Sequence, residues 1–266
     1  MSISNKAQIH PSTVIEDGAV IADDVVIGPF CHIGSDVTLA KGVELKSHVV
    51  IAGHTEIGEE TRVWPFASLG HMPQDLKYKG ERTKLEVGAR NQIRENVTMN
   101  TGTAGGGGLT KIGDDCLFMV SSHIGHDSIL GNRVILAPSA AVGGHCQIED
   151  NVLLGALAGV HQWCRIGRGA MVGAMAAVVA DVIPMGTVTG ERASLEGLNL
   201  VGLKRAGVDR GQINGLRAAF KDLFLNDLNV RDNVVAAREK YADNPLVIEV
   251  LDFIEADTRR SLTIPH

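Results

Sequence analysis

An aliphatic residue recurs every six positions over most of this chain, and this period restricts the fold more than any other feature. The series runs unbroken from Ile9 to Leu69 and resumes in the same phase at Val87. After a glycine-rich insertion, "TAGGGGLT", it restarts one residue out of phase at Ile112 and continues to Val178. Neither the 3.6-residue period of a helix nor the two-residue period of a strand produces this spacing.

Two other positions of each six-residue unit are also restricted. The fifth is small or β-branched nearly throughout, and the second is often glycine, as in "IGPFCH", "IGDDCL" and "IGRGAM". The pattern resembles the hexapeptide repeat of the left-handed parallel β-helix, in which three units form one triangular coil and glycine tolerates the turns. We therefore expect a mainly β fold whose coils stack about 4.8 Å apart. The insertions near 75–86 and 104–111 must bulge outward, and such loops often cover a site.

The cysteines fall within the same pattern. All four, Cys31, Cys116, Cys146 and Cys164, occupy the small fifth position, and none belongs to a CxxC motif. Cysteine at such positions behaves as a small hydrophobic residue, so we expect buried thiols rather than a nucleophile or a metal site.

The composition changes after Gly190. Apolar residues then follow helical spacing at Ile213, Leu216, Phe220, Leu223 and Phe224, and "NVVAAREKYADNP" and "PLVIEVLDFIEADTRRSL" indicate two further amphipathic helices. We expect a β-helix domain at 1–190 and a small α-helical C-terminal domain at 191–266. The helical part also carries a basic strip formed by Lys204, Arg205, Arg210, Arg217 and Lys221.

Composition excludes several classes of protein. The formal net charge of −6 argues against general nucleic-acid binding, which needs a basic surface. No run approaches the roughly 20 apolar residues of a membrane span. The start, "MSISNKAQIHP", lacks the regions of a signal peptide. We therefore expect a cytoplasmic protein without a membrane span.

Histidines gather at one place in the predicted coils. The segment "SSHIGHDS" holds two histidines and an aspartate, and the units that begin at Ile124, Val142 and Val160 lie on one face of successive coils. These three units contain His126, His145 and His161, and His123 ends the unit before them.

Three interpretations of this cluster remain open. The imidazoles can be solvated turn residues, or they can bind a metal such as zinc, although only Asp127 offers a nearby carboxylate. In the third interpretation His126 removes a proton from a hydroxyl while Asp127 orients its ring. Adjacent side chains need not face each other, so the spacing suggests this pair without establishing it. No strand–turn–helix nucleophile elbow supports a serine triad.

A more specific resemblance follows from longer segments. The order of "PQDLKYKGE", "TGTAGGGGLTKIG", "SSHIGHDS", "GVHQWC" and "NLVGLKR" resembles that of the acyl-acyl carrier protein:UDP-N-acetylglucosamine O-acyltransferases, and the match covers essentially the whole chain. These enzymes perform the first step of lipid A biosynthesis. The resemblance implies transfer of a (3R)-hydroxyacyl group from acyl carrier protein to the 3-hydroxyl of UDP-N-acetylglucosamine, without a metal or other cofactor.

The resemblance also implies roles for individual residues. His126 corresponds to the general base, Asp127 to its orienting carboxylate, and the backbone N–H of Gly144 to the oxyanion donor. The implied substrate-binding residues are Gln74, Asp75, Lys77, His123, His145, His161, Gln162, Asn199 and Arg205. Val201 and Ala206 stand where the family has a glutamate and a second arginine, so the nucleotide contacts of that segment depart from the family's pattern.

The family is a homotrimer with sites between neighbouring β-helices, which implies that Gln74, Asp75 and Lys77 come from one subunit and His126 from the next. Acyl carrier protein would dock on the basic strip. Acyl length is expected to depend on Ala174 and Met175 in "MVGAMAAVV", which stand where long-chain enzymes have smaller residues. Because added volume shortens a groove, we expect a preference for chains below about fourteen carbons.

Other functions are also compatible with six-residue repeats. They include the N-acyltransferase of the same pathway, a coenzyme A-dependent acetyltransferase, and transfer to a 3-amino analogue of the sugar. A noncatalytic or metal-binding protein resembling the γ-type carbonic anhydrases is a further alternative, but the helical tail and the "QDLKY" insertion are not typical of that group.

Overall fold

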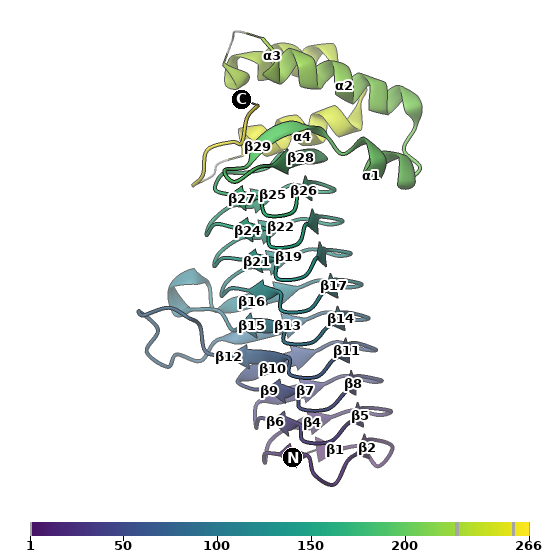
Figure 1. The fold of residues 1–266 in the computed structure, drawn as a ribbon, viewed down its shortest axis with the longest axis vertical. Coiled ribbons are helices and arrows are strands. Elements are labelled where there is room, and N and C mark those ends of the chain that lie inside the picture. Colours follow the sequence, from purple (N-terminus) through teal and green to yellow (C-terminus); the bar gives the residue numbers. More distant parts are fainter. Residues whose placement is uncertain (1, 227–228, 257–258, 266) are drawn as a thin grey trace.

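The computed structural model describes residues 2–226, 229–256 and 259–265, and the chain forms a tall column of coils with helices at one end (Figure 1). Three sheets run along the column, and almost all their strands are only two to four residues long. Paired residues are 18 apart through most of the column, as in His123 with Ala141, and 16 apart at its end, as in Met171 with Thr187. Three six-residue units therefore make one coil.

The strands of each sheet follow the stacking order. The first sheet contains β1 (Ser2–Ile3), β4 (Val20–Ile21), β7 (Val37–Leu39), β10 (His54–Ile57), β13 (Lys84–Val87), β16 (Leu109–Ile112), β19 (Ile129–Leu130), β22 (Gln147–Ile148) and β25 (Arg165–Ile166). The second contains β2 (Gln8–Ile9), β5 (Val26–Ile27), β8 (Glu44–Leu45), β11 (Arg62–Val63), β14 (Gln92–Ile93), β17 (Leu117–Phe118), β20 (Ile135–Leu136), β23 (Leu153–Leu154), β26 (Met171–Val172), β28 (Gly186–Thr189) and β29 (Ser194–Leu198). The third contains β3 (Val14–Ile15), β6 (His32–Ile33), β9 (Val50–Ile51), β12 (Ser68–His71), β15 (Thr98–Asn100), β18 (His123–Ile124), β21 (Ala141–Val142), β24 (Gly159–Val160) and β27 (Ala177–Val178).

The interior of the column is filled by the aliphatic series. In most of the short strands the second residue is buried and the first faces outward, as in β20, where Leu136 is fully buried. The four cysteines lie in the same interior with at most 2% exposure, which confirms their predicted burial. The predicted left-handed parallel β-helix with a helical C-terminal part is also confirmed.

The glycines at the second position were expected to serve the turns, but the structure gives them another role. A Cβ on Gly125 would lie 2.8 Å from the carbonyl carbon of Gly143, so glycine at the second position is required by the backbone of the next coil. The left-handed conformation falls instead on fourth residues of the units. On one corner of the column these are Asp127, His145 and Trp163, with φ of 58°, 60° and 69°.

Both insertions project from the column, as predicted (Figure 1). The first lies between β12 and β13 and exposes Leu76 completely and Met72 to 70%. The second lies between β15 and β16 and contains the short 3-10 helix η1 (Ala104–Gly106). The register is preserved across it, because Val87 still pairs with Ile112.

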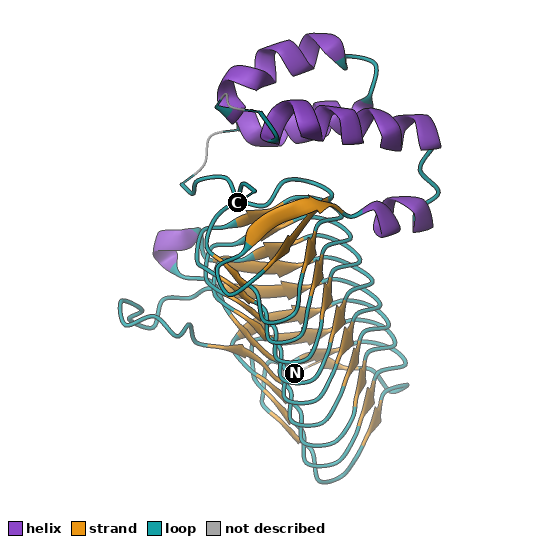
Figure 2. Cartoon of the chain, turned by 45° about the horizontal axis from the view of Figure 1, so that its top comes forward, coloured by secondary structure: helices purple, strands orange, loops and turns teal. Residues whose placement is uncertain are grey.

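The helical part follows β29, which pairs antiparallel with β28 at the end of the column. It contains α1 (Leu200–Arg205), α2 (Arg210–Phe224), α3 (Val230–Lys240) and α4 (Pro245–Glu255) (Figure 2). Helix α2 buries Ile213, Leu216 and Leu223, as its spacing predicts. The five residues of the basic strip are exposed. The domain division at residue 190 stays a prediction.

The chain after α4 differs from the expected helix. Asp257 and Thr258 lie outside the described residues, and 259–265 is not helical. Instead, the N–H of Asp181 donates to Ser261 O at 2.8 Å, and the N–H of Thr263 donates to Asp181 O at 2.8 Å. The prediction of a helix through "TRRSL" is wrong, because this backbone hydrogen-bonds to the last coil. None of the described helices combines the length and apolar character that a membrane crossing requires.

Burial gives a prediction about the thiols. It raises the pKa of Cys116 and Cys164 to about 11 and that of Cys146 to about 12, so the reactive thiolate is scarce. We expect less than about one thiol per chain to react with iodoacetamide at pH 8 in the native protein, and all four to react in urea. Mass spectrometry of the alkylated protein measures this. Rapid native labelling of Cys146 would contradict it.

Candidate active site

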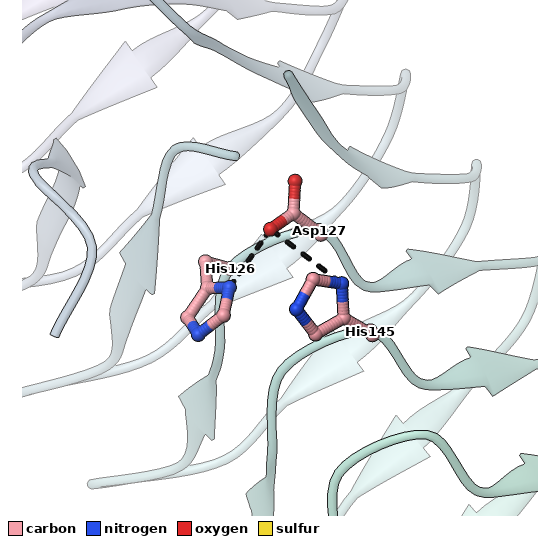
Figure 3. Close-up of side chains that lie close together, drawn as sticks. All are labelled: His126, Asp127 and His145. Carbon is pink, nitrogen blue, oxygen red and sulfur yellow. Dashed lines mark hydrogen bonds and ion pairs between the residues drawn. The ribbon is translucent and has the colours of Figure 1, made fainter. Parts of the chain in front are cut away.

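His126 and Asp127 are in direct contact. Nδ1 of His126 lies 2.8 Å from Oδ2 of Asp127, in the turn that follows β18 (Figure 3). The left-handed backbone of Asp127 turns its carboxylate back toward the preceding ring, which an extended strand would not do. Both side chains are buried, with exposures of 8% and 0%. The sequence had left this contact open.

The Asp127 carboxylate is held from the second insertion. The N–H of Thr103 donates to Oδ1 and its hydroxyl donates to Oδ2, both at 2.7 Å. The N–H of Asp127 donates to Thr110 Oγ1 at 2.8 Å. When Nδ1 of a neutral His126 donates to this carboxylate, Nε2 carries the free lone pair. Nε2 is therefore the atom able to accept a proton from a substrate.

Gly144 lies directly against the His126 ring. A Cβ at this position would be 2.7 Å from Nε2 and 2.6 Å from Cε1, so any side chain would displace the imidazole. The Gly144 carbonyl accepts a hydrogen bond from the N–H of Trp163 at 3.1 Å. Its own N–H has no acceptor among the described residues. A proton acceptor and an unused backbone donor thus lie side by side.

His145 forms the other side of the cluster. Its Nδ1 is 3.7 Å from Oδ2 of Asp127 (Figure 3), and its ring is perpendicular to that of His126 at a centroid distance of 4.9 Å. The His145 ring also stacks parallel to the Trp163 ring, with centroids 3.8 Å apart. Burial is the main cause that lowers the pKa of His145. This imidazole therefore favours the neutral form.

A cavity of about 590 Å³ opens beside the cluster. Asp127, His145, Trp163 and Arg259 line it together with Gly106 of the second insertion. A Cβ on Gly106 would lie 2.3 Å from Oδ2 of Asp127 and 2.5 Å from Cε1 of His145. The glycine-rich composition of the insertion therefore lets its backbone close over the carboxylate.

The remaining predicted site residues lie at different distances from this cluster. His123 lies close enough to His126 for its pKa to be lowered by that neighbour as well as by burial, which is the larger cause. Its Nδ1 is 2.7 Å from Thr98 Oγ1. His161 and Gln162 are exposed one coil beyond His145. Gln74, Asp75 and Lys77 lie on the first insertion, where the N–H of Lys77 donates to Oδ1 of Asp75 at 2.9 Å.

Two predicted groups lie elsewhere. Asn199 begins α1: its Oδ1 accepts from the N–H of Gly202 at 2.9 Å and its Nδ2 donates to Gly169 O at 3.0 Å, so its side chain supports the helix. Arg205 is exposed at the end of α1. Ala174 and Met175 are exposed on another corner, just before β27, and Met175 is 70% exposed.

The same cluster must be considered as a metal site. Ligand atoms of His126, Asp127 and His145 lie within 4.8 Å of one another. However, Oδ2 of Asp127 already accepts from the Thr103 hydroxyl and from Nδ1 of His126. A cation bound by both Oδ2 of Asp127 and Nδ1 of His126 would have to break the hydrogen bond between these two atoms. The arrangement therefore fits proton transfer better than metal ligation.

Trp163, Thr103 and Arg259 are among the site residues that were not predicted. Trp163 is 18 positions after His145, so the coil length alone could have placed it on the same corner. Thr103 lies in an insertion, and Arg259 lies beyond the last helix. No local sequence pattern predicts that Thr103 contacts Asp127 or that Arg259 contacts Trp163.

Comparison with known proteins identifies the family. A family model described as UDP N-acetylglucosamine O-acyltransferase, domain 2, matches residues 181–263, and a bacterial transferase hexapeptide model matches 18–53. The acyl-[acyl-carrier-protein]–UDP-N-acetylglucosamine O-acyltransferase of Rhizobium leguminosarum bv. trifolii is 50% identical over 264 residues, covering 99% of this chain and 97% of the relative. The chain belongs to the UDP-N-acetylglucosamine O-acyltransferase family.

Other members agree in sequence and in structure. The O-acyltransferase of Paracoccus denitrificans is 56% identical over 204 residues, 77% of each chain. Among solved structures, the UDP-N-acetylglucosamine acyltransferase from Campylobacter jejuni superimposes with a TM-score of 0.92 at 36% identity, covering 97% of this chain and all of that one. LpxA from Acinetobacter baumannii gives 0.90 at 39% identity, covering 96% and 99%. The O-acyltransferase fold therefore extends over both the β-helix and the helical part.

The lowered pKa values predict how stability depends on pH. Below about pH 6.5 the unfolded chain binds protons at His123 and His145 that the native protein does not bind. The free energy of unfolding therefore decreases as the pH is lowered. Urea denaturation between pH 7.5 and 5.5 measures this fall. We expect His123→Asn to make it smaller and His10→Asn, at an exposed turn, to leave it unchanged. An identical pH dependence in His123→Asn and wild type would contradict the prediction.

Proposed function

We propose that this protein transfers a (3R)-hydroxyacyl group from acyl carrier protein to the 3-hydroxyl of UDP-N-acetylglucosamine, the first step of lipid A biosynthesis. Relatives that are 56% and 50% identical to this chain carry the name of that O-acyltransferase. The observation that carries the proposal is the His126–Asp127 hydrogen bond, which leaves Nε2 free beside the Gly144 N–H.

The reaction follows from these atoms. Nε2 of His126 takes the proton of the sugar 3-hydroxyl as its oxygen attacks the thioester carbonyl. Asp127 stabilises the imidazolium, and the Gly144 N–H donates to the oxygen that becomes negative in the tetrahedral intermediate. The intermediate collapses as the carbon–sulfur bond breaks, and the thiolate takes the proton from His126. An ester and a free carrier thiol result.

Substrate binding would involve the residues around this centre. His145 and Gln162 would contact the acyl chain or another part of the substrates. The nucleotide sugar would be contacted by His123, His161, Gln74, Asp75 and Lys77. Asn199 and Arg205 would add contacts from α1. The lowered pKa of His145 makes its imidazole a weaker proton acceptor, which suits a group that hydrogen-bonds substrate rather than one that removes the proton.

A homotrimer would complete the site between neighbouring chains. The first insertion exposes two large apolar side chains, Leu76 and Met72, and exposed apolar patches often mark contacts between proteins. Packing against a second copy would cover them and bring Gln74, Asp75 and Lys77 to the neighbour's His126. The exposed basic strip suits an acidic carrier protein. Four unpaired, buried cysteines suit the cytoplasm, where thiols stay reduced.

Loss of the base should abolish most of the activity. We expect His126→Ala to lower kcat by about 100- to 10,000-fold, and Asp127→Asn to lower it substantially, because an amide no longer stabilises the imidazolium. The assay is transfer from (3R)-hydroxyacyl carrier proteins to UDP-N-acetylglucosamine. His10→Ala, at a distant turn, should keep wild-type kcat.

The same assay can refute the proposal. Light scattering must first show that each variant keeps the wild-type oligomer. If His126→Ala then retains wild-type kcat, the assignment of the base fails. If the wild type acylates only the 3-amino analogue of the sugar, the acceptor is an amine and the product an amide.

Acyl length gives a separate prediction. Met175 lies three coils beyond His126 along the third sheet, roughly 14 Å at 4.8 Å per coil, where it would limit an acyl groove. Met175 has φ of 61°, so glycine fits its backbone. Against carriers of about eight to sixteen carbons, we expect wild type to prefer chains below about fourteen and Met175→Gly to prefer chains about two carbons longer.

The control for this variant is a glycine at another left-handed position. Arg133 has φ of 55° and lies on a different corner, where it bonds Asn151. Arg133→Gly should keep the wild-type length preference. An unchanged preference in Met175→Gly would remove Met175 from the acyl groove.

A further inference from the structure

The C-terminal segment places an arginine in the candidate active site. The guanidinium carbon of Arg259 lies 3.8 Å from the centroid of a Trp163 ring, and Trp163 in turn stacks on His145. Val182 pairs with Ile166, so Asp181 lies opposite Arg165, and the Asp181 backbone hydrogen-bonds to Ser261 and Thr263. The segment thus runs beside the last coil, next to β25, which begins two residues after Trp163, and Arg259 reaches the face of the indole from there.

The other two arginines near this cavity are already bonded. Nε of Arg165 donates to Oδ2 of Asp181 at 2.8 Å, and its terminal nitrogen donates to Phe253 O at 3.0 Å. Arg260 lies 2.6 Å from Nδ1 of His161 and donates to Gln162 O at 3.0 Å. Both guanidinium groups therefore serve to join the C-terminal part to the column.

Arg259 differs from both. Within residues 2–226, 229–256 and 259–265 its nitrogens make no hydrogen bond or ion pair, and its guanidinium lies on the face of Trp163. It lines the cavity that also contains Asp127 and His145. A guanidinium stacked on an aromatic ring keeps its N–H groups at the edge available for an oxyanion.

We propose that Arg259 binds a phosphate group of a substrate in this cavity. The inference rests on the proposed function, since both of its substrates carry phosphate: the diphosphate of the nucleotide sugar and the phosphodiester of the carrier's prosthetic arm. The planar fork of arginine matches two phosphate oxygens, and stacking on Trp163 fixes the plane of that fork. Lysine would provide the charge but not the fork.

The experiment compares ligands that differ only by phosphate. Calorimetry measures the affinities of UDP and uridine for the full-length protein. Kinetics compares the same (3R)-hydroxyacyl group on phosphopantetheine and on pantetheine. The phosphate preference is the ratio of affinities, or of rates, for the ligand with phosphate over the ligand without it. In Arg259→Gln we expect one of the two ratios to fall by about 10- to 100-fold, while the value for the ligand without phosphate is unchanged. Arg259→Lys should recover part of the loss.

The two arms identify the source of the phosphate. A loss confined to UDP against uridine assigns Arg259 to the nucleotide sugar, and a loss confined to phosphopantetheine assigns it to the carrier arm. Arg62→Gln, on an exposed position of β11 in the second sheet two coils before the coil of His126, controls for removing a surface charge and should retain both preferences.

Two outcomes would overturn the inference. If Arg259→Gln keeps both phosphate preferences, Arg259 does not bind phosphate. If it lowers affinity equally for ligands with and without phosphate, its role is only to support Trp163. Failure of the proposed function is distinguishable, because wild type would then transfer no acyl group, whereas the binding of UDP and uridine is measured without turnover.

Discussion

The packing of one aliphatic residue from each six-residue unit into a narrow interior is the constraint on which the rest of this structure depends. A coil closes in 18 residues, so an extra residue within a unit would turn the following side chains away from the interior. The chain changes phase by one residue between Met99 and Ile112, and the second insertion absorbs the whole shift. Val87 and Ile112 pair in register across it.

The same constraint builds the active site. Because the coils stack directly, residues 18 apart become neighbours along a corner, and Asp127, His145 and Trp163 form one such series. Backbone hydrogen bonds fix the series: the N–H of His145 donates to His126 O at 2.9 Å, and the N–H of Trp163 donates to Gly144 O. The reacting groups are therefore held by the hydrogen-bonded stack of coils, as preorganised catalysis requires.

Stacked corners alone cannot enclose a reaction, and the enclosing parts come from segments outside the repeat. The second insertion brings Thr103 and Gly106 onto the Asp127 carboxylate. The C-terminal segment brings Arg259 onto Trp163 after returning from the helices. Each is anchored by backbone hydrogen bonds to the column, so the additions are positioned by the same frame that holds the pair of His126 and Asp127.

The sequence by itself determined the coil, its buried cysteines and the gathering of histidines on one face, because a strict period converts spacing along the chain directly into position in space. Only the tertiary structure decided that His126 touches Asp127, since this depends on the left-handed backbone at Asp127. It also decided the contacts of Thr103 and Arg259, and the non-helical course of 259–262 where a helix was expected. These follow from hydrogen bonds between segments far apart in sequence, which no local pattern encodes.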